Sequence, residues 1–343
     1  AAFSPTFQTP FVQQASLSVE KEVAERLHLN VSYLYTHGEH LIRARDVNLP
    51  SPIRVSYPVF DESGEDFLGS YYDVASFSPW IMTKTLDCPF PPCAGDVQRP
   101  ISQIGAINVF ESAATSVYHG ATVSLQRKMT RGLYFRVGYT WGQAIDDGQD
   151  ALVAGRPATV QNSYSPSERS WSSVDQRQRW VAAWTYQPRL FGREHLALRA
   201  LFNNWKLSGV STYGSGRPVS ARIVGDANRD GNTGNDRLPG YSRNAFTGPN
   251  YMTADLRVSR TFRLTEYLKL ELMAEAFNVL NRDNKRVNSS DDGFDNSAAT
   301  FVQQDAVVNA THFPAQYRLL NGFMRPTDSY APRQLQFAIR LFY

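Results

Sequence analysis

The sequence predicts an all-β protein, a transmembrane antiparallel β-barrel, and three observations support that fold class. Polar and apolar residues alternate over several stretches, these stretches come in pairs joined by short turns, and long connections separate the pairs. Strict alternation gives a strand one apolar and one polar face, which suits a wall between lipid and a wet lumen. Aromatic residues, which favour strands, make up 13% of the chain.

Four strand pairs can be placed along the chain. Near the N-terminus, residues 14–19 and 27–35 flank a turn at 22–26. In the second pair, 121–141, apolar residues occupy alternate positions on both sides of a turn at 128–132. The third pair joins 180–186 to 196–213 around a turn at 188–194. Each pattern predicts an antiparallel hairpin.

The fourth pair covers 253–277 and turns near Thr265 and Glu266. Residues 267–280 are also rich in helix formers, so a helix is the alternative there. Apolar residues keep a period of two up to Ala276, which favours a strand.

Connections between the strands alternate in length. Short turns lie near 21–26, 129–132, 188–194 and 263–266, whereas the predicted long loops are 38–103, 146–175, 215–250 and 279–330. Such loops are rare in compact soluble domains, but short periplasmic turns and long extracellular loops are the rule in bacterial outer-membrane barrels. Residues 1–343 are therefore expected to form a single β-barrel region in the bacterial outer membrane, in contact with outer-membrane lipid.

Aromatic residues near the predicted strand ends are typical of the two girdles of such a barrel. A β-sandwich is the alternative, because its core also alternates aromatic and polar residues, but the loop asymmetry favours the barrel. The expected outer girdle is Tyr139, Trp141, Trp180, Tyr213 and Tyr251, and the inner girdle is Phe262, Tyr267 and Tyr343.

Composition and motifs argue against several other classes. Mean hydropathy is −0.38, and no run of roughly 18 apolar residues is present, so no transmembrane helix is expected. Net charge is +3 with dispersed charges, which does not indicate nucleic acid as a partner. The GxSxG, HExxH and P-loop motifs are absent, so no enzymatic activity is expected. The N-terminus lacks signal-peptide features, so the chain is expected to be a mature product or a piece of a longer one.

Residues 225–237, GDANRDGNTGNDR, contain the start of a calcium-loop pattern, D-x-N-x-D-G. Oxygen-bearing side chains at every second position around a glycine turn are able to wrap one hard cation. The pattern departs at its twelfth position, where Arg237 replaces the bidentate glutamate and the nearest acid comes one residue early. A polar surface loop is the alternative that this composition favours. The predicted Ca²⁺ ligands are Asp226, Asn228, Asp230, Asn232 and Asp236.

Cys88 and Cys93 lie in a proline-rich stretch, DCPFPPCAGD. A disulfide formed in an oxidising compartment is the favoured interpretation, because the alternative, a zinc half-site, needs two further ligands that the neighbourhood lacks. Two more acidic clusters fall in predicted outer loops and are expected to be solvated loop charges. They are Asp146, Asp147 and Asp150, and Asp291, Asp292 and Asp295.

The last segment, RQLQFAIRLFY, alternates up to its terminal aromatic residue. It resembles the C-terminal signal that the barrel-assembly machinery recognises. The residues expected to face lipid and to form this signal are Leu335, Phe337, Ile339, Leu341 and Tyr343, whereas Gln334, Gln336, Ala338 and Arg340 are expected to face inward. No residue is singled out for substrate binding.

Longer segments carry a resemblance to a known family: SVYHGATVSLQRKMTRGLYFRVGYTWGQAIDD, DQRQRWVAAWTYQP, DANRDGNTGNDR, MTADLRVSRTFRL, LMAEAFNVLNRDN and RQLQFAIRLFY. In this order they resemble the C-terminal part of the β-barrel of Oar-like TonB-dependent transporters, outer-membrane receptors of the acidobacterial type. The resemblance covers nearly the whole chain and is weakest at 50–103 and 285–330.

The resemblance implies a receptor or transporter component that imports an unknown solute, with a plug domain and TonB as partners. No counterpart of the family's plug or TonB-contacting segment is found in the sequence, and roughly 12 strands can be drawn, against the 22 of such transporters. The strands are expected either to close on themselves or to be completed from elsewhere, because open strand edges are not viable in lipid. The alternatives are a plug-free structural or adhesive surface barrel that binds a partner or glycan through its loops, and a secreted soluble β-protein that binds glycan or calcium.

Overall fold

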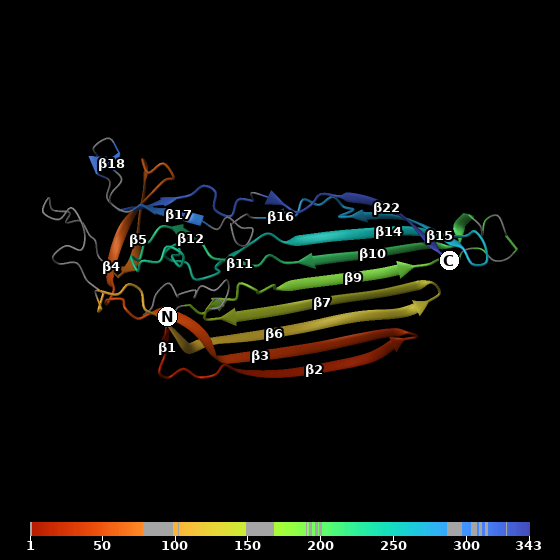
Figure 1. Cartoon of the computed structure of the whole chain (residues 1–343), viewed down its shortest axis with the longest axis horizontal. Coiled ribbons are helices and arrows are strands. Elements are labelled where there is room, and N and C mark those ends of the chain that lie inside the picture. Colours follow the sequence, from red (N-terminus) through yellow and green to blue (C-terminus); the bar gives the residue numbers. More distant parts are fainter. Residues whose placement is uncertain are drawn as a thin grey trace.

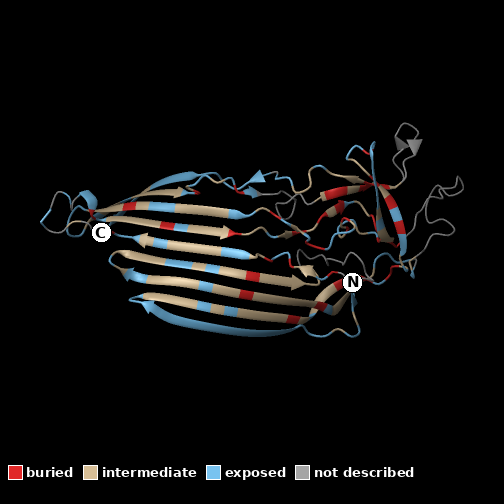
Figure 2. Ribbon diagram, turned by 180° about the vertical axis from the view of Figure 1, so that it is seen from behind, coloured by how far each residue is buried: buried red, intermediate tan, exposed pale blue. Residues whose placement is uncertain are grey.

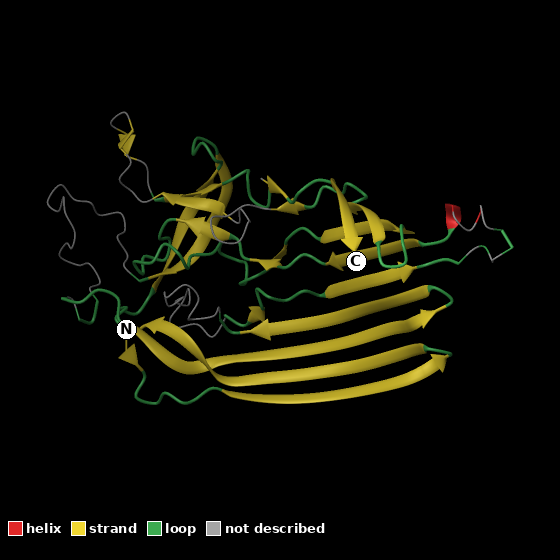
Figure 3. Cartoon of the chain, turned by 45° about the vertical axis from the view of Figure 1, so that its right-hand side comes forward, coloured by secondary structure: helices red, strands yellow, loops and turns green. Residues whose placement is uncertain are grey.

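The main body of the chain is one antiparallel sheet of long strands that lie side by side (Figures 1 and 3). The structure is a computed structural model that describes residues 2–77, 99–101, 103–148, 168–189, 191, 194–195, 198, 201–286, 297–302, 307–308, 311–312, 315–326 and 328–343. In spatial order the long strands are β2 (Phe11–Ala24), β3 (Leu27–Asp46), β6 (Asn108–Thr130), β7 (Leu133–Asp146), β9 (Gln178–Tyr186), β10 (Trp205–Gly214), β14 (Tyr251–Arg263), β15 (Lys269–Phe277) and β22 (Gln334–Phe342). Two short strands join them, since β1 (Ala2–Phe3) pairs with β6 and β8 (Ser170–Trp171) pairs with β7.

The strand register gathers the apolar residues on one face of this sheet. Directly opposed residues form rows across neighbouring strands, and many of the side chains are exposed: Val31 and Val123 are each 45% exposed and Phe337 is 78% exposed. A sheet that leaves such a row uncovered suits a lipid environment. One row is Val19, Val31, Val123, Tyr139, Trp180, Tyr213 and Met252, and another is Leu207, Val258, Ala274 and Phe337.

The opposite face of the same sheet is polar and internally hydrogen-bonded. Cross-strand hydroxyl pairs join Thr122 to Thr140 at 3.0 Å and Thr185 to Ser208 at 3.1 Å. Nearer the C-terminus, alternating positions carry charge, and Arg257 Nε donates to a Glu275 carboxylate oxygen at 2.6 Å. One apolar face and one wet face confirm the predicted alternation and match the wall of a membrane barrel.

One end of the sheet is closed by short turns. The β6–β7 turn consists of Arg131 (φ 49°) and Gly132 (φ 81°), and two successive positive φ values are the signature of a type I′ hairpin turn. The strand prediction at 267–280 is confirmed as β15, so the helix alternative is wrong. The predicted strand at 196–213 begins only at Trp205, because a short helical stretch that includes Leu201 and Phe202 precedes it. No described helix is long and apolar enough to span a membrane.

The two outer strands of the sheet, β2 and β22, are open edges. No described residue of β2 pairs with β22, and β2 is exposed along its whole length. The described residues therefore form an open wall of nine long strands, fewer than the number expected from the sequence.

A second sheet stands at the long-loop end of the wall (Figure 1). It has five strands, in spatial order β12 (Arg222–Val224), β17 (Ser297–Val302), β20 (Gln316–Leu319), β4 (Ile53–Phe60) and β5 (Phe67–Ser76). These strands come from the connections that follow β3, β10 and β15. β3 itself runs on to Asp46, so the first connection begins later than the predicted position 38. We call these five strands, together with residues 221–238, the outer cap.

The hydrophobic core of the chain lies in the outer cap, and Figure 2 shows buried residues concentrated there. The ring of Phe301 lies 4.9 Å from that of Tyr57 and 5.1 Å from that of Tyr317, measured between centroids. The long sheet has no such core because its apolar face points outward. The buried cluster consists of Val55, Tyr57, Val59, Ala221, Ile223, Ala227, Leu238, Ala298, Ala299, Phe301 and Tyr317.

Three further pairs of two-residue antiparallel strands lie among the described residues of the loops. They are β11 (Pro218–Val219) with β13 (Phe246–Thr247), β16 (Lys285–Arg286) with β21 (Asp328–Ser329), and β18 (Val307–Val308) with β19 (Thr311–His312).

Candidate functional site

The predicted calcium loop is built into the outer cap. It follows β12, and both Ala227 within the loop and Leu238 directly after it belong to the buried cluster. Backbone hydrogen bonds close it from both sides, because Ile223 N donates to Asp236 O at 3.1 Å and Leu238 N donates to Ala221 O at 2.9 Å. The loop is therefore fixed to the cap core at both of its ends.

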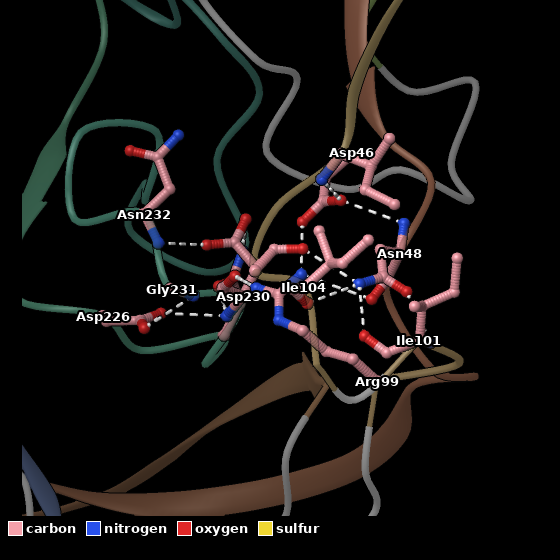
Figure 4. A network of polar contacts seen from close by, with 12 residues as sticks. Asp46, Asn48, Arg99, Ile101, Ile104, Asp226, Asp230, Gly231 and Asn232 are labelled. Atoms are coloured by element: carbon pink, nitrogen blue, oxygen red, sulfur yellow. Dashed lines mark hydrogen bonds and ion pairs between the residues drawn. The ribbon is translucent and has the colours of Figure 1, made fainter. Parts of the chain in front are cut away.

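Side-chain oxygens of the loop accept hydrogen bonds from its own backbone (Figure 4). The two carboxylate oxygens of Asp226 accept from Asp230 N at 3.1 Å and Gly231 N at 2.9 Å. Asp230 in turn accepts from Asn232 N at 2.7 Å. Gly231 has φ +88°, a conformation that costs glycine little and other residues more. The acidic side chains thus stabilise the turn of the loop by accepting hydrogen bonds from its backbone.

Burial sets the electrostatics of these acids. Asp236 is 1% exposed, and its Oδ1 accepts from Asn228 N at 3.2 Å, whereas its Oδ2 has no hydrogen-bond partner. Burial, together with the charges of Asp226 and Asp230, raises the pKa of Asp236 to about 8. Burial also raises the pKa of Asp230 to about 6. Burial and mutual repulsion therefore favour the neutral, protonated form of these acids.

Arg99 connects this loop to the end of β3 (Figure 4). Its Nη1 donates to Asp46 Oδ2 at 2.7 Å, and its Nη2 donates to the backbone oxygen of Asp230 at 2.6 Å. Asn48 braces the same corner, because its side-chain nitrogen donates to the backbone oxygens of Ile101 and Ile104. No sequence pattern points to Arg99 or Asn48, since neither lies in a motif and their partners are distant along the chain.

A second polar network corrects one prediction about the acidic clusters. Asp146, expected to be a solvated loop charge, pairs with the guanidinium of Arg243, which is 2% exposed. Asp147 pairs with Arg169 at 3.1 Å. Both acids therefore join loops together. Asp150 and the cluster at 291–295 lie outside the described residues.

Arg237, which stands where the calcium pattern has its glutamate, is held elsewhere. Its Nη2 donates to Glu168 Oε1 at 2.7 Å, so its side chain is committed to the connection after β7. This ion pair leaves Asp236 as the acid nearest the end of the loop. Cys88 and Cys93, the predicted disulfide, lie outside the described residues.

The residues of the predicted assembly signal lie on β22 and just beyond it. They occupy alternate positions, and the first four oppose residues of β15 in the register Leu335–Ala276, Phe337–Ala274, Ile339–Leu272 and Leu341–Leu270. All are exposed, and Tyr343 follows the end of the strand.

Comparisons with known proteins agree with this architecture. The family model described as outer membrane beta barrel domain matches residues 1–240 and 240–336. No curated protein matches the chain.

Similar solved structures include the outer membrane transporter YddB from Escherichia coli, at 11% identity and a TM-score of 0.45, covering 99% of this chain and 33% of that one. The ferripyoverdine receptor of the outer membrane of Pseudomonas aeruginosa is 14% identical with a TM-score of 0.44, covering 97% of this chain and 27% of that one. The FrpB iron transporter from Neisseria meningitidis is 10% identical with a TM-score of 0.43, covering 99% and 32%. The chain thus spans about a third or less of their length. Since the family model covers most of the sequence, the chain belongs to the outer membrane beta-barrel domain family and lies in the bacterial outer membrane.

Proposed function

We propose that the chain forms part of the wall of a TonB-dependent receptor or transporter, of the Oar-like type that its sequence resembles. It would import a solute when combined with a plug domain and energised through TonB. The observation that carries this proposal is the inner face of the open wall, which is polar and holds cross-strand hydroxyl pairs together with the Arg257–Glu275 ion pair.

This inner face suits a folded domain packed against it. Thr122 pairs with Thr140 and Thr185 pairs with Ser208 across the strands, so hydroxyl groups line part of this face. Small polar side chains let a partner approach closely and offer it hydrogen bonds, which a lumen filled by bulky side chains would not. A plug inside a barrel is such a partner.

The second candidate function is a plug-free surface barrel that binds a partner or glycan through its loops. The outer cap favours it, because its edge strand β5 displays Phe67 at 47% and Tyr71 at 62% exposure. The two rings lie 5.4 Å apart at the extracellular end, and exposed aromatic pairs of this kind suit binding.

Depletion of solutes from the growth medium separates the two functions. The bacterium that encodes the chain is grown as wild type, as a deletion of the gene, and as a deletion of TonB. The spent media are then compared by mass spectrometry. We expect the gene deletion to leave behind a subset of the solutes that the TonB deletion leaves, and the wild-type gene to restore their uptake.

Two results would oppose the transport proposal. One is identical depletion in the wild type and the gene deletion, under conditions where the protein is detected in the outer membrane. The other is weakened attachment of the gene-deletion strain to cells or glycan surfaces with unchanged uptake, which supports the adhesive barrel. The Phe67→Ala variant then tests whether attachment depends on the cap.

A further inference from the structure

The loop at residues 226–236 holds a buried acid that the protein itself does not satisfy. Asp236 is 1% exposed, one of its carboxylate oxygens has no hydrogen-bond partner, and no described cationic side chain forms an ion pair with it. Leaving a carboxylate oxygen buried and unpartnered is costly. A group outside the chain would remove this cost.

We propose that the loop binds one Ca²⁺ ion, with Asp226, Asn228, Asp230 and Asp236 as the oxygen donors. In the structure no three described acidic or histidine side chains stand together as a ready metal site. Binding therefore requires the side chains of the loop to turn toward a common centre. This proposal does not depend on whether the barrel transports a solute.

Binding would require movement of side chains and not of the backbone, because the backbone already forms the turn that the calcium-loop pattern needs. The two oxygens of Asp226 accept hydrogen bonds from the fifth and sixth residues of the loop, so Asp226, Asn228 and Asp230 lie on one compact turn. A carboxylate oxygen that accepts one backbone hydrogen bond keeps a second lone pair for a cation. The Asp230 side chain would exchange the hydrogen bonds that it accepts from Asn228 Nδ2 at 3.4 Å and Asn235 Nδ2 at 2.9 Å for the cation.

The donor chemistry selects calcium among common ions. All proposed donors are carboxylate or amide oxygens, which hard cations prefer, and no cysteine or histidine is among them. An irregular loop with several protein oxygens suits Ca²⁺, which accepts six to eight ligands in flexible geometry, better than Mg²⁺, which demands a strict octahedron. The two positive charges of Ca²⁺ would also offset most of the repulsion between the three carboxylates.

Occupancy would brace the extracellular end of the protein. Asp230 is tied through its backbone oxygen to Arg99, and Arg99 is tied to Asp46 at the end of β3. Ala227 within the loop and Leu238 directly after it lie in the cap core. A cation that fixes the loop would therefore stabilise the connection after β10, the connection after β3 that contains Arg99, and the core of the outer cap.

The test uses the purified protein in detergent micelles, stripped with a chelator and then titrated with CaCl₂ by calorimetry and by hydrogen exchange of residues 221–238. We expect one saturable site with a dissociation constant of roughly 0.1–1 mM, as in extracellular calcium modules. Exchange in the loop and in β12 should slow on binding, whereas the strands of the wall should not change.

Matched substitutions locate the site. Asp236→Asn and Asp230→Asn should each weaken binding at least about tenfold, because affinity follows the number of ligand charges. Asp73→Asn is the control, since Asp73 lies on β5 of the same cap and pairs with Arg54 at the surface. It should bind calcium like the wild type. Heat-modifiable migration and circular dichroism verify that each variant is folded, and Asn228→Ala serves if an aspartate variant is not.

Three outcomes would overturn the proposal. The wild type could show no calcium-dependent protection at 10-fold the expected dissociation constant. The Asp236→Asn and Asp230→Asn variants could bind like the wild type, or Asp73→Asn could lose binding equally. None of these results bears on uptake, because no solute is present in the assay.

Discussion

Replacing Phe301 by alanine is expected to unfold the outer cap while the wall stays intact. The Phe301 side chain is 4% exposed and lies at the centre of the cap core, between the rings of Tyr57 and Tyr317. The described strands of the long sheet do not pair with the cap strands and are held by their own ladder of backbone hydrogen bonds.

The expected magnitude follows from the size of this core. Truncating a buried phenylalanine to alanine costs about 3–5 kcal/mol, which includes the cavity left behind. The buried cluster has only 11 residues, and a core of that size rarely supplies more than about 3–5 kcal/mol of stability. The loss is therefore comparable to the whole stability of the cap.

Hydrogen exchange and limited proteolysis of outer-membrane vesicles measure this effect. Residues 53–60, 222–224 and 316–319 should lose protection in Phe301→Ala, and proteases added outside should cut the loops. Heat-modifiable migration, which reports the wall, should stay unchanged. Phe67→Ala is the control, because Phe67 is 47% exposed on the edge strand β5. A cap that remains as protected as in the wild type, or a wall that fails together with the cap, would refute the reasoning.

Three further predictions address the turn, the edge strand and pH. Gly132→Val should slow assembly of the β6–β7 hairpin, because φ at Gly132 is +81° and a Cβ there would stand 2.2 Å from the Gln187 backbone oxygen. Pulse-chase folding into membranes would measure the assembly rate, and a rate equal to that of the wild type would contradict the prediction. Phe337→Asp should impair membrane assembly by placing a charge on the lipid face, whereas Gln336→Asp on the inner face should not; equal assembly of the two variants would count against the assigned faces. Hydrogen bonds from Ser63 and from backbone amides lower the pKa of Asp61 to about 2, so the β4–β5 turn should gain support from this acid above pH 4 and lose it as pH falls toward 2. Amide exchange corrected for its intrinsic pH dependence would test this, and an unchanged turn would reject it.

The long strands could be predicted because their pattern is local. A period of two appears within each segment, and a two-residue turn such as Arg131–Gly132 needs only its neighbours in sequence. The stretch after residue 196 misled the prediction, because its apolar residues also suit the helical stretch that precedes Trp205. Pattern alone does not separate short helices from strands.

The outer cap could not be predicted in the same way, because its strands meet across large distances in sequence. β4 pairs with β20 and β12 pairs with β17, both in parallel, so no hairpin signal joins them. The acids of the calcium pattern were visible in the sequence, but the burial of Asp236 depends on this cap. The partner of Asp146, Arg243, likewise comes from another loop.

Lipid accessibility along β7 tests the assignment of the wall most directly. Single spin-labelled cysteines are placed at each position from 133 to 141 in a protein whose Cys88 and Cys93 are replaced by serine, reconstituted in liposomes, and probed with oxygen and a water-soluble nickel complex. We predict a period of two, with high oxygen accessibility at 133, 135, 137, 139 and 141 and lower values between them, because these positions continue the apolar rows of the register. Uniform accessibility along the strand, or nickel access at the odd-numbered positions, would contradict an outer-membrane wall.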